Sequence, residues 1–367
     1  MTVKWKHMAI VSVLVLAACG KENRLSSPDV PLTFNVTTAE IQTKAVTGKT
    51  MSPKYDTNES FVVYSAFSEE EFDPSGTYVP FWDEDDGVTC SYNIDYRAWL
   101  PAGDYLWPMA GYLTFQAYSP ASASSLTSHD WSTGFTFTAF TVPDTDHIDD
   151  MYDLLYTDRV ENRQRSQYNS NNPYDERVGD GGPYKGIDLS FKHALCMIEV
   201  TAVNGLGSGA PSQFYIQKVE LRNLWRTATF SNGSWGSYSG AKADYTLLNL
   251  AGNPSPADWQ QLPGGEQEVS PLHPDKVMML LPQPLDRSVE PGLNTTNDAY
   301  IHIEWKKTTG AQTVDDVAKQ DADFALGSVW EPGIKYCYKL IFSDYIEFEA
   351  SIRRWDDEIT GSYLINY

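Results

Sequence analysis

Cys19 is the residue whose type and position point most directly to chemistry in this chain. It follows Leu16-Ala17-Ala18, after two early lysines and an apolar run over residues 9–16. This order is typical of a secretory signal peptide with small residues at the cleavage point, and bacterial lipoproteins carry their lipid on a cysteine placed there. The run is much shorter than the ~20 residues of a membrane-spanning helix. We therefore predict removal of residues 1–18 and lipidation of Cys19; an ordinary signal peptide with a coincidental cysteine is the alternative.

The mature chain is strongly acidic. Removal of residues 1–18 leaves 25 basic side chains against 49 acidic ones, a net charge of about −24. Such a surface repels phosphate backbones and anionic lipid headgroups. The composition argues against nucleic acid as a partner and leaves the lipid on Cys19 as the attachment to an outer membrane.

Catalytic chemistry has little support in the sequence. The mature chain contains no GxSxG nucleophile motif. His193 ends a strand within the segment FKHAL, where a packed structural histidine is more typical than a general base. Carboxylate pairs for glycoside hydrolysis form only in space, and nothing in the sequence singles one out. We predict a protein that is not an enzyme.

Two acidic clusters could bind calcium through carboxylate oxygens. One covers residues 83–86, and the other comprises the aspartates of residues 144–150. The first misses the EF-hand spacing, and in so acidic a chain such clusters are usually solvated loops. We predict no metal and no other cofactor, with calcium as the alternative.

Three cysteines remain beyond Cys19, namely Cys90, Cys196 and Cys337. An odd number permits at most one disulfide. Cys196 and Cys337 both lie in apolar, strand-like runs, which favours buried free thiols. A bridge between these two cysteines is the alternative.

Aromatic residues crowd the segment 223–240, which turns at Asn232-Gly233 in the manner of a β-hairpin. Trp225, Trp235 and Tyr238 could form an exposed platform on which sugars stack. Cross-strand aromatic pairing within a sandwich is the other interpretation, and the composition favours it.

Alternation of apolar and polar residues with a period of two dominates the mature chain. Half-buried antiparallel strands require this pattern, and helical periodicity is confined to a turn or two within residues 149–165. Apolar faces at this period occur in segments 32–36, 113–117, 135–138, 187–192, 218–222, 301–305, 336–342 and 346–352. Many short strands separated by Gly, Pro, Asn and Ser predict an all-β protein made of antiparallel β-sandwiches.

The polar stretch 162–186 is the best candidate for a domain boundary. It has almost no aliphatic side chains, and a new strand opens at Ile187; a long loop within the first domain would look the same. We predict a signal peptide over 1–18, a lipidated flexible tether over 19–31, an N-terminal sandwich over 32–186 and a C-terminal sandwich over 187–367.

Several short motifs follow one another in a fairly specific order. They are Trp107-Pro108 with the strand FQAYSP at 115–120, then the segment DLLY at 153–156, then FKHAL at 191–195. In this order, and after the lipoprotein start, they resemble the fimbrillin-like proteins, the type V pilus subunits and related surface lipoproteins of Gram-negative anaerobes. The resemblance implies two tandem β-sandwiches of transthyretin-like, Greek-key type, the second opened by the FKHAL strand. It also implies display on the outer membrane, as part of a fimbrium.

The resemblance further implies assembly by strand donation. In that process a protease removes the first strand, and a strand of another subunit fills the open groove. The protease of the best-known systems prefers Arg, whereas no Arg lies between Leu25 and Arg97. Trimming here would need Lys44, Lys49 or Lys54, or would not happen, which favours an anchor or accessory subunit that keeps its lipid.

We expect the first strand, residues 32–36, to be the replaceable one. At the other end of the chain, Tyr363, Ile365 and Tyr367 form a second alternating face, which could be donated to a neighbour or add the last strand of its own domain. We predict a fimbrial structural, anchor or accessory subunit that supports adhesion. Its partners would be other pilus subunits and a ligand on a host or bacterial surface. A stand-alone glycan-binding surface lipoprotein is the alternative, and a secreted hydrolase built on sandwiches is a weaker one.

Overall fold

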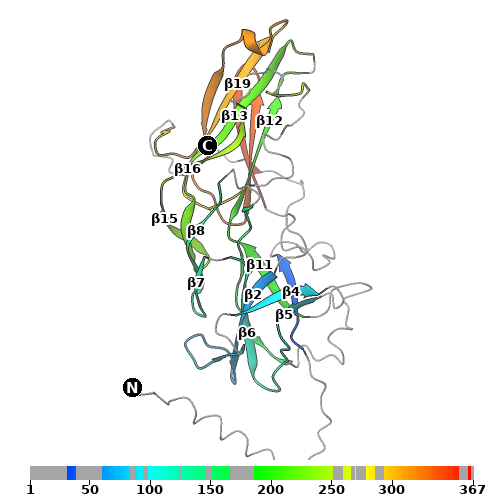
Figure 1. Ribbon diagram of the computed structural model, residues 1–367, viewed down its shortest axis with the longest axis vertical. Helices are drawn as coiled ribbons and strands as arrows, with labels where there is room; N and C mark the ends of the chain where they lie inside the picture. Colours follow the sequence, from blue (N-terminus) through cyan, green and yellow to red (C-terminus); the bar gives the residue numbers. More distant parts are fainter. Residues whose placement is uncertain are drawn as a thin grey trace, which may run out of the picture.

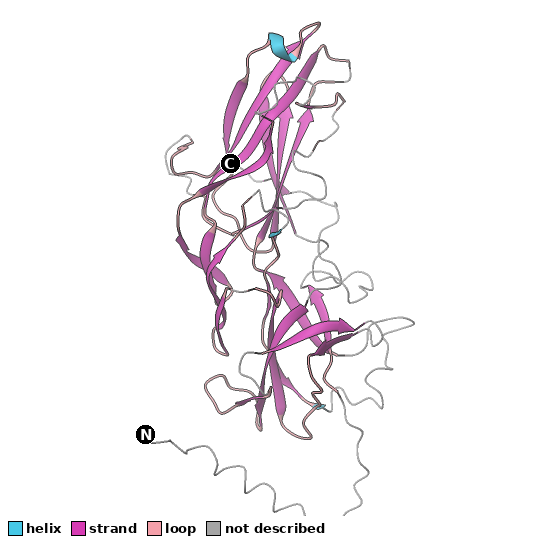
Figure 2. Ribbon diagram, in the orientation of Figure 1, coloured by secondary structure: helices cyan, strands magenta, loops and turns pink. Residues whose placement is uncertain are grey.

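The computed structural model describes residues 31–38, 60–82, 87–93, 98–123, 125–144, 150–165, 186–207, 209–250, 259–265, 269, 278–285, 293–354 and 363–364. The described chain is an elongated stack of β-sheets, with a 3-10 turn at Val314–Asp316 (Figures 1 and 2). None of the helices in these residues is long and apolar enough to span a membrane. The predicted all-β class is confirmed.

The N-terminal sheet lies at the lower end of Figure 1 and closes on itself. Its order is β10-β6-β9-β11-β1-β5-β4-β2-β3, and β2 also pairs with β6. The strands through β6 are β1 Phe34–Thr38, β2 Ser60–Ser68, β3 Val79–Pro80, β4 Val88–Asn93, β5 Ala98–Pro101 and β6 Tyr112–Ser119. The others are β9 Leu155–Thr157, β10 Val160–Arg163 and β11 Ile187–His193. Because β2 and β6 join, the strands from β6 through β1 to β2 surround one core.

Strand β6 shows why the apolar pattern produces this closed sheet. Leu113, Phe115 and Ala117 are fully buried, as their alternation predicts. The intervening Thr114 and Gln116 are also buried, although an outer face was expected to be solvated. The reason is a second sheet that packs over them, so β6 has core on both faces.

That second sheet has four strands and combines both halves of the chain. Its order is β15-β14-β8-β7, with β7 Leu126–Asp130, β8 Gly134–Thr141, β14 Thr227–Ser231 and β15 Ser234–Ser239. The predicted hairpin turn is confirmed, since Asn232 and Gly233 have φ of 51° and 72°. Positive φ at both central residues is what a two-residue hairpin loop demands.

The C-terminal half forms a sandwich of two sheets. One sheet has the order β18-β12-β21-β22-β23, with β12 Cys196–Asn204, β18 Met278–Leu280, β21 Ile334–Phe342, β22 Ile346–Arg354 and β23 Tyr363–Leu364. The other has the order β16-β13-β19-β20, and β17 also pairs with β13. Its strands are β13 Ser212–Leu224, β16 Ala243–Asn249, β17 Gln260–Gln261, β19 Tyr300–Thr309 and β20 Gln320–Ala325. Phe214 meets Phe342 across the two sheets at 5.5 Å between ring centroids.

Pairing within the sheets is antiparallel with two exceptions among the described strands, β1 with β11 and β12 with β21, which are parallel. The strand at Ile187, expected to open the second domain, instead pairs with β1 and β9 in the N-terminal sheet. The chain therefore crosses to the C-terminal sandwich after His193, one strand later than expected. Independent folding of the two halves stays a prediction.

Residues 149–165 also differ from expectation. In place of a helical turn or two, the described part of this segment contains β9 and β10. The cause is non-local: Leu155, Tyr156 and Thr157 pair with β11 residues more than thirty positions later, and such pairing overrides a weak local pattern.

Candidate functional site

The first strand, β1, occupies the interior of the N-terminal sheet. It runs parallel to β11 from Phe34↔Ile187 to Thr38↔Phe191, and its other side meets β5 at Phe34↔Trp99. The predicted apolar face is confirmed, since Leu32, Phe34 and Val36 are exposed by only 1%, 1% and 7%. A strand that lies near the chain start thus fills a groove between two strands of the rest of the sheet.

The groove beneath β1 is lined by aromatic rings. Phe34 makes edge contacts with Phe61 and Phe115, at 6.0 and 5.5 Å between centroids. Phe61 in turn contacts Trp99 and Phe191 at 5.3 and 5.5 Å. Full burial of a large apolar side chain contributes about 1.5–3 kcal/mol, so the apolar face of β1 contributes roughly 5–8 kcal/mol to its place in the groove.

Backbone bonds at the start of β1 depend on a glycine. The amide of Leu32 donates to the carbonyl of Tyr105, and the amide of Ile187 donates to the carbonyl of Thr33, both at 2.9 Å. A Cβ atom added at Gly186 would lie 2.8 Å from the carbonyl oxygen of Thr33 and from the carbonyl carbon of Phe34. Gly186 therefore allows the close approach of the first strand to β11.

The C-terminal tail adds to its own domain in this structure. Tyr363 and Leu364 pair with Ile352 and Ser351 of β22, at the edge of the sheet. The sequence left open whether the tail joins a neighbouring subunit or adds the last strand of its own domain, and in this structure it adds to its own domain. The remaining tail residues, including Ile365 and Tyr367, lie outside the described residues.

Two of the motifs that carry the family resemblance meet in the structure. Asp153, from the DLLY segment, lies 2.5 Å through Oδ2 from Nδ1 of His193, from the FKHAL segment, and both side chains are buried. The next amide, that of Ala194, donates to the carbonyl of Leu154 at 2.8 Å. The packed position predicted for His193 is confirmed, while its structural rather than catalytic role stays a prediction; it lies at the point where the chain leaves the N-terminal sheet.

The three aromatic residues proposed for sugar stacking are partly buried. Trp235 donates from Nε1 to the carbonyl of Ala194, and Tyr238 donates to the carbonyl of Pro282 at 2.8 Å. The rings of Trp225 and Tyr238 lie 6.4 Å apart, inclined by 31°. A hollow of about 280 Å³ adjoins Trp235 and Tyr238. These contacts agree with aromatic packing within the hairpin, while a role in sugar binding stays a prediction.

The cysteines are not bridged. Cys90 and Cys196 are buried and Cys337 is half-buried, and none of the three is part of a disulfide. The alternative bridge is wrong because of register: Cys337 lies opposite Glu199 of β12, three residues beyond Cys196. Burial raises the pKa of the Cys90 and Cys196 thiols well above the usual value, which keeps them protonated and unreactive.

Other predicted positions lie wholly or partly outside the described residues. These are Cys19, the candidate cleavage sites Lys44, Lys49 and Lys54, and most of the two acidic clusters. Within the part of the chain that the structure describes, no group of three His, Cys, Asp or Glu side chains is placed to hold a metal ion.

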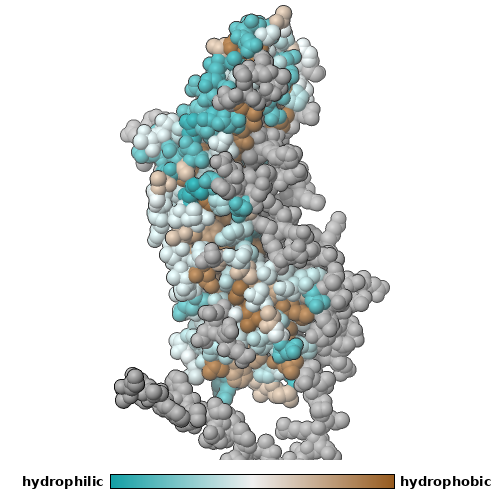
Figure 3. Space-filling model, viewed as in Figure 1, coloured by the Kyte–Doolittle hydropathy of each residue, from teal (hydrophilic) through white to brown (hydrophobic). Residues whose placement is uncertain are grey.

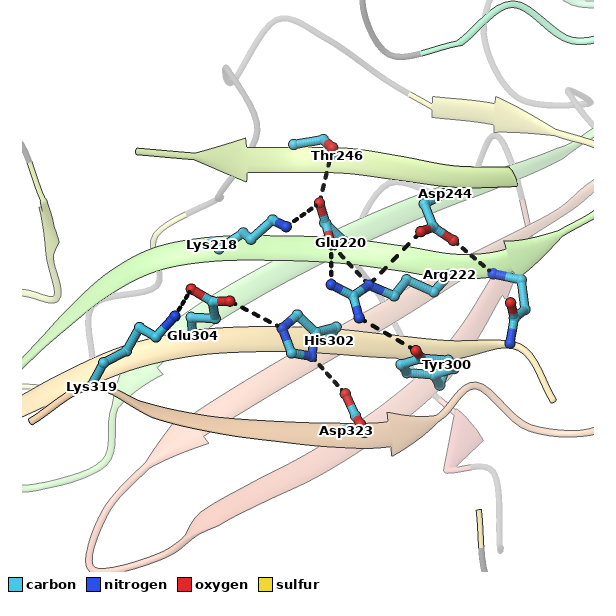
Figure 4. A network of polar contacts seen from close by, with 11 residues as sticks. Lys218, Glu220, Arg222, Asp244, Thr246, Tyr300, His302, Glu304, Lys319 and Asp323 are labelled. Carbon is cyan, nitrogen blue, oxygen red and sulfur yellow. Dashed lines mark hydrogen bonds and ion pairs between the residues drawn. The ribbon is translucent and has the colours of Figure 1, made fainter. Parts of the chain in front are cut away.

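A polar network covers one face of the C-terminal sandwich (Figure 4). Glu220 accepts from Lys218 and Arg222 at 2.7 and 2.6 Å. On the neighbouring strand, His302 lies between Asp323 and Glu304, at 2.7 and 3.4 Å. Hydrophilic residues also gather at this end of the molecule in the space-filling view (Figure 3). The charges are engaged with one another, so the network joins β13, β19 and β20 rather than presenting a reactive group.

Together the fold and the groove define a class: an all-β protein in which a strand near the chain start fills an apolar groove inside the N-terminal sheet. The fimbrillin-like family model matches residues 43–355, and the chain belongs to that family. No curated protein matches this chain.

Solved structures provide further likenesses. A fimbrial protein from Bacteroides vulgatus superposes with a TM-score of 0.57 at 15% identity, covering 89% of this chain and 100% of that one. A fimbrial assembly protein from Parabacteroides distasonis gives a TM-score of 0.38 at 11% identity, covering 92% and 99%. The tip fimbrial protein Mfa3 from Porphyromonas gingivalis, truncated at its C-terminus, gives 0.40 at 14% identity, covering 89% and 100%. The first of these supports the fold.

Proposed function

We propose that this chain is a fimbrial subunit, structural, anchor or accessory in role, that assembles at the cell surface by β-strand donation and supports adhesion. The observation that carries the proposal is the position of β1 between β11 and β5. Its removal would expose the rings of Phe61, Phe115 and Trp99 in a groove with free backbone groups on both sides. An extended strand from another subunit supplies both missing components, the apolar face and the hydrogen bonds.

The donor in this proposal is the C-terminal tail. Tyr363 and Leu364 form β23, which pairs with β22 and lies at the edge of its sheet, so an edge strand, with a partner on one side, is the one that would be released. The residues after Trp355 could span about 40 Å when extended at ~3.3 Å each, enough to reach a neighbouring subunit. Anchoring of the assembly to the outer membrane would come from lipid on Cys19.

The test replaces residues 44–50 by the recognition site of a sequence-specific protease. Cleavage should release the first strand and give ladders of high-molecular-weight species on mild, unboiled gels, and a synthetic peptide spanning residues 31–38 should suppress them. In the same background, Ile365→Asp should abolish the ladders, because it places a charge in an apolar groove, while the monomer stays folded.

Two outcomes contradict the proposal. Cleaved protein that remains monomeric after the released strand has been removed is not a strand acceptor, and ladders that persist in Ile365→Asp exclude the tail as donor. Membrane attachment is tested separately: Cys19→Ala should prevent incorporation of labelled palmitate and release the protein from the outer-membrane fraction.

A further inference from the structure

A polar hollow of about 490 Å³ lies between the N-terminal sheet and the four-stranded sheet. Three turns form its walls, and they are far apart in the sequence. They are residues 131–133 between β7 and β8, residues 158–159 between β9 and β10, and residues 232–233 between β14 and β15. Its volume falls in the range of about 300–1,000 Å³ that is usual for small-molecule sites.

The floor of the hollow is fixed by hydrogen bonds. Gln116 donates from Nε2 to the carbonyl of Thr157 at 3.2 Å, and its Oε1 lies 3.0 Å from Nε2 of His129. Burial lowers the pKa of His129 to about 4, more than the charge of Asp130 raises it. The histidine is therefore neutral at pH 7, and its Nε2 proton is donated to Gln116.

The walls are also held in place. Asp130 accepts from the amides of Ser132 and Thr133 at 2.8 and 3.0 Å, which closes the first turn. Tyr156 packs edge-on against Phe230 at 4.9 Å between centroids. A site whose polar groups are fixed before binding loses less entropy when a ligand arrives.

The charges around the hollow come in matched pairs. Lys192 lies 2.5 Å from Asp158, and Arg159 lies 2.9 Å from Glu161. Equal numbers of cations and anions, in a protein of formal net charge −22, give no attraction for a polyanion. The polar lining equally disfavours a lipid. Four of the strands that border the hollow, β8, β9, β11 and β14, already have a partner on each side within their sheets, so they offer no free edge with which a peptide strand could pair.

We propose that this hollow is a binding site for a neutral oligosaccharide. Sugar hydroxyls both donate and accept hydrogen bonds, and the hollow provides carboxylates, cationic donors and hydroxyls within one small space. Sugar rings also carry apolar C–H faces, for which the half-buried ring of Tyr156 at the hollow is a suitable partner. The site is distinct from the platform of Trp225, Trp235 and Tyr238 and involves no part of β1.

The test uses the purified full chain on an array of immobilised neutral and anionic oligosaccharides, followed by titration of each retained sugar. Asp158→Asn with Lys192→Met removes an exposed pair at the rim, and Thr133→Trp fills the hollow from an exposed position. The matched control is Asp344→Asn with Lys307→Met, which removes an exposed pair of similar length, 3.1 Å, elsewhere. Thermal melting confirms that each variant is folded.

Neutral sugars should be retained by the native chain and by the control, with at least a tenfold loss of affinity in both variants of the hollow. The proposal is overturned if no neutral sugar is retained, if only anionic sugars are retained, or if both variants of the hollow bind as the native chain does. Formation of ladders after removal of β1 should be unaffected by these substitutions, so failure here is distinguishable from failure of strand donation.

Discussion

The two parallel strand pairs among the described strands occupy similar interior positions but differ in the length of their ladders. In the C-terminal sandwich, β12 pairs with β21 continuously from Met197 to Asn204 and with β18 on its other side. In the N-terminal sheet, β1 pairs with β11 over Phe34–Thr38, and among the described residues its other side meets β5 at Phe34↔Trp99. The parallel ladder of β1 is thus shorter than that of β12 in the part of the chain that the structure describes, while its apolar side chains are just as deeply buried.

In the proposed assembly, this difference would decide which part of the molecule is exchanged. Apolar contacts are non-directional, so any strand with a suitable alternating face can make the apolar contacts that β1 makes. A long ladder such as β12 with β21 must be broken bond by bond, and its register is fixed by the burial of one face. In the proposed assembly, the N-terminal sheet would therefore carry the replaceable element, and the C-terminal sandwich would serve as the stable frame.

The largest expected effect is that of Phe34→Ala. Removing this ring from between Phe61 and Phe115 should cost about 3–5 kcal/mol. Hydrogen exchange should become faster in β11 and β5 while β12 and β21 keep their protection. The same loss of protection in both regions would show that the two halves unfold as one unit and that the comparison above is wrong.

Acidification should also lower the stability of the N-terminal part of the molecule. His129 lies in β7 against Tyr64 of β2, with ring centroids 4.2 Å apart, and burial lowers its pKa to about 4. In the unfolded chain histidine titrates near pH 6.5. Between these values the unfolded state binds more protons, so stability that is complete above pH 6.5 is lost as the pH falls towards 4.

The free energy of unfolding should fall by about 2–3 kcal/mol between pH 7 and pH 4.5. Urea denaturation at both pH values measures it. His129→Gln separates this effect from the titration of carboxylates, because the variant should show a smaller difference between the two pH values. An equal difference in the variant and the native chain would exclude His129 as the cause.

A smaller effect is expected from Gly186→Ala. The added methyl group would meet the backbone of Thr33 and Phe34, and overpacking of this kind costs about 1–3 kcal/mol. The first strand should therefore detach more readily, seen as faster proteolysis at residues 31–38. Gly236→Ala is the control, because no atom lies within 4 Å of its added Cβ; equal proteolysis in the two variants would contradict the role of Gly186.

Much of the fold follows from local pattern. The period-two faces of β1 and β11 and the Asn232-Gly233 turn could be predicted, because strand alternation and turn geometry depend on neighbouring residues. The sheet to which β11 belongs could not, since its partners, β1 and β9, are distant in sequence. Parallel pairing in particular has no local signature, because many other strands lie between β1 and β11, and between β12 and β21, along the chain.

The candidate sites divide in the same way. The face of β1 was visible in the sequence, whereas the polar hollow depends on three turns whose proximity is set by the tertiary fold. Gln116 illustrates the limit: its place on the polar side of β6 predicted exposure, yet it forms the buried floor of the hollow. Gln116 is buried only because the four-stranded sheet packs over β6.

The smallest effect is expected in the C-terminal sandwich, from Glu220→Gln. Burial alone would raise the pKa of Glu220, but hydrogen bonds from Lys218 and Arg222 outweigh it and lower the pKa below the usual value. A lowered pKa means that the stabilisation is present above about pH 4.5 and is lost as the pH falls further. Because Lys218 and Arg222 are partly exposed, water compensates much of the loss. We expect a cost of about 1 kcal/mol, measured by urea denaturation at pH 7.

Asp344→Asn provides the comparison for this prediction. Its ion pair with Lys307 is almost fully exposed on the carboxylate side, and pairs of that kind contribute little to stability. The free energy of unfolding should therefore be unchanged in Asp344→Asn and reduced in Glu220→Gln, with the reduction confined to the C-terminal sandwich. If Glu220→Gln instead accelerated the release of β1, the network of Figure 4 would be coupled to the N-terminal groove, and the frame would not be independent of the exchangeable strand.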